Sequence, residues 1–134
     1  MGSSVKRMTI RQRVMQTRAR YRRLTPAEAR EAVDLGSLLI DTRCGDALQA
    51  DGRIPGALHI PLSVLPWRAD PASPYRDRRI RGLNTPLILL CAHGFSSSLA
   101  VGTLMDLGFT RVTDVEGGFA EWRRAGLPVM TADD

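Results

Sequence analysis

The sequence predicts an α/β fold in which helices alternate with the strands of a parallel sheet. Residues 38–41 form a short apolar run that ends on Asp41, and a second run at residues 87–91 is hydrophobic on both faces, as the central strands of parallel sheets are. Segments with helical spacing separate and follow these runs, and this alternation is typical of an α/β sandwich. A chain of 134 residues has room for a single core, so we expect one globular domain.

The first helix of this domain has a clear start signal. Thr25 is placed as the N-cap, with Pro26 in the first turn and Glu28 three residues after the cap. Gly36 ends this helix. Four short elements then follow in order: the strand at 38–41, a helical stretch around 46–50, a strand at 57–60 and a helical turn up to 67. Residues 68–86 hold prolines and an arginine cluster, and we expect them to form an irregular surface excursion.

An apolar pattern with helical spacing begins after the second apolar run and is stopped by Gly108. Its members are Leu99, Val101, Gly102, Leu104, Met105 and Phe109. Residues 112–115 predict one more strand, and Gly117 and Gly118 break it. A short amphipathic helix is expected over residues 119–124.

The second apolar run delivers Cys91 into a tight polar loop. The following helix directs its free N–H groups over this loop, and such donors stabilise a thiolate. A nucleophilic cysteine is therefore one interpretation, and a small buried hydrophobic residue is the other. The neighbours favour the nucleophile: Gly94 permits a tight backbone, His93 is titratable, and the serines at 96–98 offer hydroxyls to an anion.

Two strands of the predicted sheet end on polar residues. Asp41, Thr42 and Arg43 follow one strand, and Cys91 follows another. Ligands bind beyond the carboxyl ends of parallel strands, so we expect both groups at the same edge of the sheet. Asp41 and Arg43 are expected to form an ion pair that supports the site.

The net charge of +5 is concentrated at the N-terminus. Residues 1–23 carry eight of the 19 Lys and Arg side chains and none of the 14 acidic ones. The charge therefore indicates an arm rather than a nucleic-acid-binding face. The arm is either a solvated, partly helical extension, a contact for RNA, acidic lipid or a partner, or an Arg-rich transit peptide. Because its charge is segregated, we expect deletion of residues 1–19 to leave the thiol chemistry largely unchanged.

Other classes of protein are disfavoured by what the sequence lacks. No apolar stretch approaches the roughly 18–20 residues of a membrane span, and no secretory signal is recognisable. Two cysteines do not make a disulfide scaffold, so a reducing, cytoplasmic location is expected. The two histidines and two cysteines lack metal-ligand spacing, and we expect no metal and no cofactor.

Four segments together resemble the rhodanese homology domain over about residues 21–130. They are Leu39-Ile40-Asp41-Thr42-Arg43, residues 52–61 from Gly52-Arg53-Ile54-Pro55-Gly56 to Pro61, the Cys91 loop, and residues 117–122 with Gly126-Leu127-Pro128-Val129. The resemblance implies a rhodanese-like three-layer α/β/α fold with a central parallel sheet of about five strands. It divides the chain into a basic arm (1–20), the domain (21–130) and a short tail (131–134).

The resemblance also implies sulfurtransferase chemistry. Cys91 would take a sulfane sulfur from a donor such as thiosulfate, become a persulfide, and pass the sulfur to cyanide, a thiol or a protein partner. The backbone N–H groups of the loop would bind the anion, from Ala92, His93, Gly94, Phe95, Ser96 and Ser97. Some family members carry arginine where this chain has Ser96. Phosphatase activity is disfavoured, because the position six residues after Cys91 is a serine rather than a bidentate arginine.

Several side chains have two open roles. His93 either contacts the donor or points to solvent, and Phe95 is placed to shape the pocket mouth. His59 is expected to be a hydrogen-bonded structural residue, and Trp67 and Trp122 to pack in the core or at its rim. Cys44 either resolves an oxidised Cys91 as a disulfide or is a passive thiol. Two rival functions follow: a noncatalytic binding module, and a persulfide or redox sensor that uses Cys44.

Overall fold

The computed structural model describes residues 7–131 and contains a four-stranded, entirely parallel sheet. The strands are β1 (Leu38–Asp41), β2 (Leu58–His59), β3 (Leu87–Leu90) and β4 (Val112–Asp114), in the spatial order β2-β1-β3-β4. All four lie where the sequence predicts strands. The outermost parts of the predicted arm and tail, residues 1–6 and 132–134, lie outside the described residues.

The expected count of about five strands is wrong by one, and the edge of the sheet beside β4 explains the difference. Leu24 forms an isolated parallel bridge with Val115 there. Its N–H donates to the Asp114 carbonyl at 3.1 Å, and its carbonyl accepts from the Glu116 N–H at 2.8 Å. Thr25 already caps a helix at the next position, so the chain turns away before a strand can extend.

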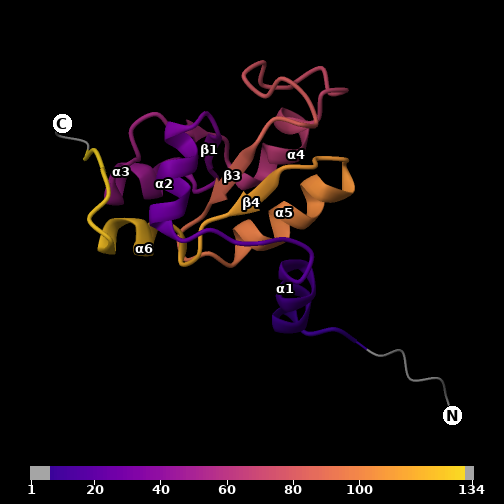
Figure 1. Ribbon diagram of the computed structural model, residues 1–134, viewed down its shortest axis with the longest axis horizontal. Helices are drawn as coiled ribbons and strands as arrows, with labels where there is room; N and C mark the ends of the chain where they lie inside the picture. Colours follow the sequence, from indigo (N-terminus) through magenta and orange to yellow (C-terminus); the bar gives the residue numbers. More distant parts are fainter. Residues whose placement is uncertain (1–6, 132–134) are drawn as a thin grey trace, which may run out of the picture.

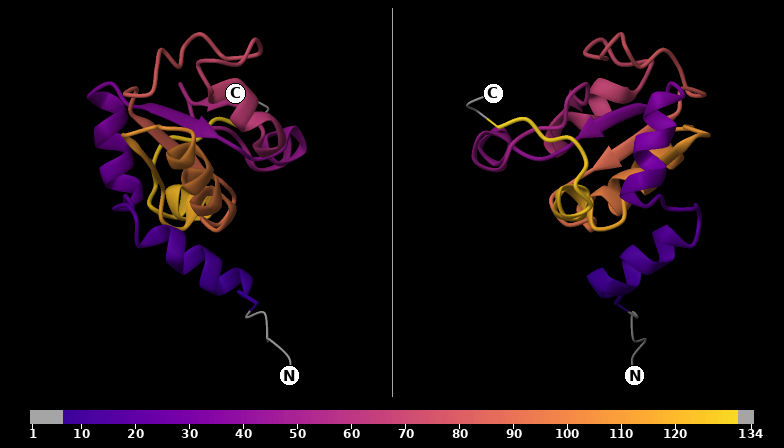
Figure 2. Two further views of the ribbon diagram at one scale, coloured as in Figure 1. Left: turned by 90° about the vertical axis from the view of Figure 1, so that its right-hand side faces the viewer. Right: turned by 60° about the vertical axis from the view of Figure 1, so that its left-hand side comes forward.

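Two helical layers enclose the sheet, as Figures 1 and 2 show. On one face, α2 (Pro26–Asp34) and α6 (Gly118–Arg124) pack on the alternate strand residues Leu39, Ile88 and Leu90. On the other face, α4 (Leu65–Ala69) and α5 (Ser96–Asp106) pack on Ile40, Leu87 and Leu89. Two shorter helical elements, α3 (Gly45–Asp51) and the 3₁₀ turn η1 (Leu62–Val64), lie between β1 and α4 in the chain. The three-layer α/β/α fold is confirmed.

The N-terminal segment forms a helix, α1 (Ile10–Arg18), that lies against the outer side of α5 (Figure 1). Thr9 and Gln12 make a capping box at its start. Val14 and Thr17 are buried, and Gly102 of α5 faces Thr17. A Cβ on Gly102 would lie 2.8 Å from the Thr17 methyl carbon, so the glycine permits close approach of the two helices. The helical character of the arm agrees with the sequence, whereas this docking was not anticipated.

The irregular excursion expected over residues 68–86 begins two residues later, because Arg68 and Ala69 belong to α4, and residues 70–86 contain neither helix nor strand. Ile80, 1% exposed, inserts into the core and holds the segment down. The buried carboxylate of Asp77 forms two ion pairs through its Oδ2, with Arg79 Nη2 at 2.6 Å and with Arg68 Nη2 at 3.6 Å. The hydrogen bond from Arg79 lowers the pKa of Asp77 to about 2. Arg79, one member of the arginine cluster, therefore forms an ion pair within its own segment rather than lying at the edge of the Cys91 loop.

Candidate active site

Cys91 follows β3 directly and lies beneath the start of α5. Its side chain is buried, and its Sγ accepts hydrogen bonds from two backbone N–H groups, those of Gly94 at 3.1 Å and Ser97 at 3.3 Å. Burial by itself would raise the pKa of the Cys91 thiol, but hydrogen bonds from Ser96, Ser97 and Gly94 outweigh burial and lower it. The loop therefore favours the thiolate, as its strand–loop–helix sequence predicts.

The tight shape of this loop depends on glycines in two segments. Gly94 has a φ of +86°, and a Cβ there would lie 2.8 Å from the Gly117 nitrogen. Gly118, with a φ of +60°, approaches so closely that a Cβ would overlap the carbonyl oxygen of Cys91. The Phe119 N–H donates to that carbonyl at 2.8 Å. The turn between β4 and α6 thus forms the floor of the Cys91 loop.

The outer residues of the loop face solvent. Ala92 and His93 are exposed, and the Phe95 ring is 63% exposed. Of the six predicted anion-binding N–H groups, the structure directs those of Gly94 and Ser97 to the Sγ. The exposed position of Phe95 at the apex fits a residue at the mouth of the site.

Asp41 and Arg43 lie at the same edge of the sheet as Cys91, as predicted. Asp41 pairs with Leu90 across β1 and β3, and the Thr42 N–H donates to the Leu90 carbonyl at 2.8 Å. Arg43 Nη2 lies 2.7 Å from Asp41 Oδ2, with both side chains buried. The guanidinium also lies 3.7 Å from the centre of the Phe119 ring, at the start of α6. The ion pair therefore connects β1 to the helix that supports the Cys91 loop.

His59 and Cys44 lie near this edge, and within residues 7–131 neither side chain hydrogen-bonds to the Cys91 thiol. His59 Nε2 is 2.7 Å from the Arg43 carbonyl oxygen, which agrees with a structural histidine. Cys44 is an exposed free thiol at the N-cap of α3. Trp122 is buried, and its Nε1–H donates to the Pro128 carbonyl at 2.9 Å, while Trp67 is 58% exposed.

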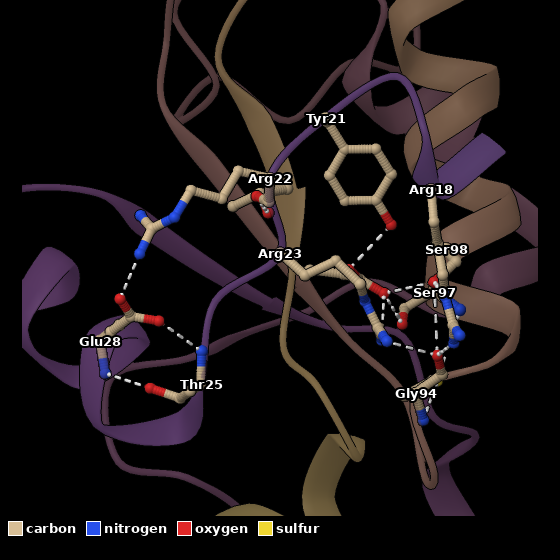
Figure 3. A network of polar contacts seen from close by, with 12 residues as sticks. Arg18, Tyr21, Arg22, Arg23, Thr25, Glu28, Gly94, Ser97 and Ser98 are labelled. Atoms are coloured by element: carbon tan, nitrogen blue, oxygen red, sulfur yellow. Dashed lines mark hydrogen bonds and ion pairs between the residues drawn. The ribbon is translucent and has the colours of Figure 1, made fainter. Parts of the chain in front are cut away.

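A buried carboxylate, Asp114 at the end of β4, organises the other side of the loop. Figure 3 labels four of its partners, Tyr21, Arg23, Ser97 and Ser98. The carboxylate accepts hydrogen bonds from the hydroxyls of Ser97 and Ser98 at 2.7 and 2.8 Å. Tyr21 Oη donates to it at 2.8 Å, and Arg23 donates from Nε and Nη2 at 2.9 and 3.1 Å. Asp114 therefore joins β4, the first turn of α5 and the segment before α2.

These contacts fix the ionisation of the partners of Asp114. Burial raises the pKa of Tyr21, and the Asp114 charge adds to that rise, so the phenol remains a donor. Burial opposes the charge on Arg23, but the hydrogen bonds and charge of Asp114 outweigh it and raise the pKa of Arg23. The sequence analysis did not predict this cluster. Asp114 lies in a predicted strand and Arg23 in a basic segment, and neither local pattern indicates that the two side chains meet.

Within residues 7–131, no group of three or more His, Cys, Asp or Glu side chains is arranged to hold a metal ion. Over the same residues, no helix combines the length and apolar character that crossing a membrane requires.

A sequence profile of the rhodanese-like domain matches residues 25–125. The chain therefore belongs to the rhodanese-like domain family and is an enzyme of the rhodanese type. It is 34% identical over 103 residues to the thiosulfate sulfurtransferase GlpE of Pseudomonas syringae pv. syringae, covering 77% of this chain and 88% of that protein.

Two solved structures are similar along much of the chain. A protein of unknown function from Rhodopseudomonas palustris, described as a possible tyrosine phosphatase, has a TM-score of 0.84 at 30% identity and covers 96% of this chain and 98% of its own. A rhodanese-related protein from Thermoplasma volcanium has a TM-score of 0.65 at 30% identity, covering 82% of this chain and 98% of its own.

Proposed function

We propose that this enzyme carries sulfane sulfur as a persulfide on Cys91. In the first step the Cys91 thiolate attacks the outer sulfur of thiosulfate. A new S–S bond forms, the S–S bond of thiosulfate breaks, and sulfite leaves with the electron pair. The Cys91 persulfide anion that remains carries the charge that the thiolate brought, so no proton transfer is needed.

In the second step a nucleophilic acceptor attacks the outer sulfur of the persulfide. With cyanide, a C–S bond forms, the persulfide S–S bond breaks, and thiocyanate leaves while Cys91 returns to the thiolate. A small thiol or a cysteine of a protein partner would accept the sulfur in the same way. The donor and acceptor classes come from the family resemblance and from the name of the relative in Pseudomonas syringae.

The observation that carries the proposal is the pair of backbone N–H groups directed at the Cys91 Sγ from Gly94 and Ser97. This arrangement suits a soft sulfur anion, which needs hydrogen-bond donors but no general base. Cys44 is exposed, and no N–H group of residues 7–131 donates to its Sγ. An intact nucleophile in an intact loop also counts against a noncatalytic binding module.

The reaction class can be tested by two assays run side by side. We expect thiosulfate–cyanide transfer and no hydrolysis of a chromogenic aryl phosphate. A phosphoryl group needs a bidentate cation in its transition state, and the residue six positions after Cys91 is Ser97. The phosphatase assay is informative because the similar Rhodopseudomonas palustris protein is described as a possible tyrosine phosphatase.

The control for both assays is Cys91→Ser, which identifies any contaminating activity. Phosphate release that depends on Cys91, without sulfur transfer, would overturn the proposal. Inactivity in both assays would instead favour the binding module.

A further inference from the structure

We propose that Arg18 and Arg23, from the segment preceding the catalytic domain's first helix α2, are positioning residues for the Cys91 loop. They hold the Gly94 carbonyl on the outer side of the loop and bring a positive charge to it. The inference rests on the proposed function only in taking Cys91 as the reacting thiol.

The first observation is that both arginines converge on one carbonyl, as Figure 3 shows. Arg18 Nη2 donates to the Gly94 oxygen at 2.7 Å, and Arg23 Nη2 donates to it at 2.9 Å. The N–H of the same residue, Gly94, donates to the Cys91 Sγ. The Gly117 backbone restrains Gly94 on one side, and the Ser98 hydroxyl lies 3.4 Å from the Gly94 carbonyl oxygen, a longer contact than either arginine makes. The two guanidinium groups therefore make the shortest hydrogen bonds to this carbonyl and fix its direction.

Each arginine is itself held in place. Arg23 is bound by both oxygens of Asp114. Arg18 donates from Nε to the Ser98 hydroxyl at 2.9 Å, and that hydroxyl donates in turn to Asp114. The Arg18 guanidinium also lies 5.6 Å from the centre of the Phe95 ring. The Cys91 loop is therefore held at the Gly94 carbonyl by two guanidinium groups, each of which is fixed by further hydrogen bonds.

The two arginines differ in charge balance. Arg23 forms an ion pair with Asp114, whereas within residues 7–131 no carboxylate lies within ion-pair distance of Arg18. Arg18 thus adds an uncompensated positive charge beside a loop that itself contains no arginine. A nearby cation favours the thiolate and the persulfide anion over their neutral forms.

The position of Arg18 depends on how α1 docks on α5. Gly102 admits the Thr17 methyl group, and the Thr17 hydroxyl donates to the Arg13 carbonyl at 3.0 Å, which fixes the Thr17 rotamer. Arg18 follows Thr17 directly in the last turn of α1. This contact does not fit the expectation that residues 1–19 are dispensable, because it places one of them on the loop.

The test uses the alkylation rate of Cys91 with iodoacetamide as a function of pH, in a Cys44→Ser background. The parent should show an apparent pKa below the value of about 8.5 for a free cysteine. Arg18→Gln should raise it, because the hydrogen bond to Gly94 and the charge are lost, and should slow alkylation at pH 7 about 3- to 10-fold. Arg20→Gln is the matched control, since it removes an arginine and a 2.9 Å contact to Asp106 of α5 but nothing on the loop.

A second pair of variants tests the docking without altering any arginine. Gly102→Ala should displace α1 and slow alkylation as Arg18→Gln does, although alanine itself suits a helix better than glycine. Adding Thr17→Ser removes the methyl group that the new Cβ would meet, so it should restore the parent rate.

An unchanged pH profile in Arg18→Gln, or an equal change in Arg20→Gln, would overturn the proposal. A lowered Tm without a change in the profile would also overturn it, because it would mean a structural role alone. The readout does not require sulfur transfer. A parent that alkylates as described but ignores thiosulfate would refute the proposed function and leave the positioning role supported.

Discussion

Replacing Cys91 with serine is expected to lower thiosulfate–cyanide turnover by at least ~10³-fold, to the uncatalysed background. Serine keeps the size of the side chain, but its hydroxyl forms no persulfide and stays protonated in a loop built to hold a sulfur anion. The Gly94 and Ser97 N–H groups that contact the Cys91 Sγ remain available to the hydroxyl oxygen. The fold should therefore persist, as circular dichroism and Tm would report.

The matched control is Cys44→Ser, at the other, exposed cysteine. Its turnover should stay within about twofold of the parent, since surface substitutions away from a site have small effects. Substantial turnover in Cys91→Ser, lost only when Cys44 is also replaced, would move the chemistry to Cys44.

Asp114→Asn is expected to cause the largest loss of stability, about 3–5 kcal/mol of the free energy of unfolding. The substitution keeps the shape of the side chain but removes the charge that compensates Arg23. It also puts an NH₂ donor in place of either Oδ2, which accepts both serine hydroxyls, or Oδ1, which accepts from Tyr21 and Arg23. Asp114 is fully buried, so water cannot replace these bonds. Since small domains have only about 5–15 kcal/mol in total, a urea titration should show a markedly lower midpoint.

Asp106→Asn provides the comparison, because Asp106 also pairs with an arginine of the N-terminal segment. That ion pair is exposed, with the Arg20 and Asp106 side chains 46% and 65% accessible. Its loss should cost at most about 1 kcal/mol. Equal midpoints for the two variants would mean that the Asp114 cluster contributes no more than a surface ion pair.

The features that the sequence predicted correctly depend on local patterns. The run at 87–91 is apolar enough to be a central strand, and the helical spacing from Leu99 to Phe109 identifies the helix that follows it. The common edge of Asp41 and Cys91 followed from the parallel topology alone, and the register of Asp41 with Leu90 confirms it. The Asp41–Arg43 ion pair could be predicted because the two residues are only two positions apart in the chain.

The features that were missed depend on contacts between distant segments. Arg23 and Asp114 are 91 residues apart, and Arg18 and Gly94 are 76 apart. The sequence around an arginine in a basic arm is the same whether its side chain is solvated or hydrogen-bonded to a distant loop, as that of Arg18 is to Gly94. Likewise, the single bridge of Leu24 to Val115, in place of a fifth strand, depends on where the chain turns into α2.

Mass spectrometry of the purified protein after incubation with thiosulfate tests the central claim most directly. The account predicts that the peptide containing Cys91 gains the mass of one sulfur atom, that sulfite is released in equal amount, and that cyanide removes the added sulfur as thiocyanate. The adduct should be absent from Cys91→Ser and present in Cys44→Ser. A protein that stays unmodified by thiosulfate, or that takes up sulfur on Cys44 alone, would contradict the assignment of Cys91 as the sulfur carrier.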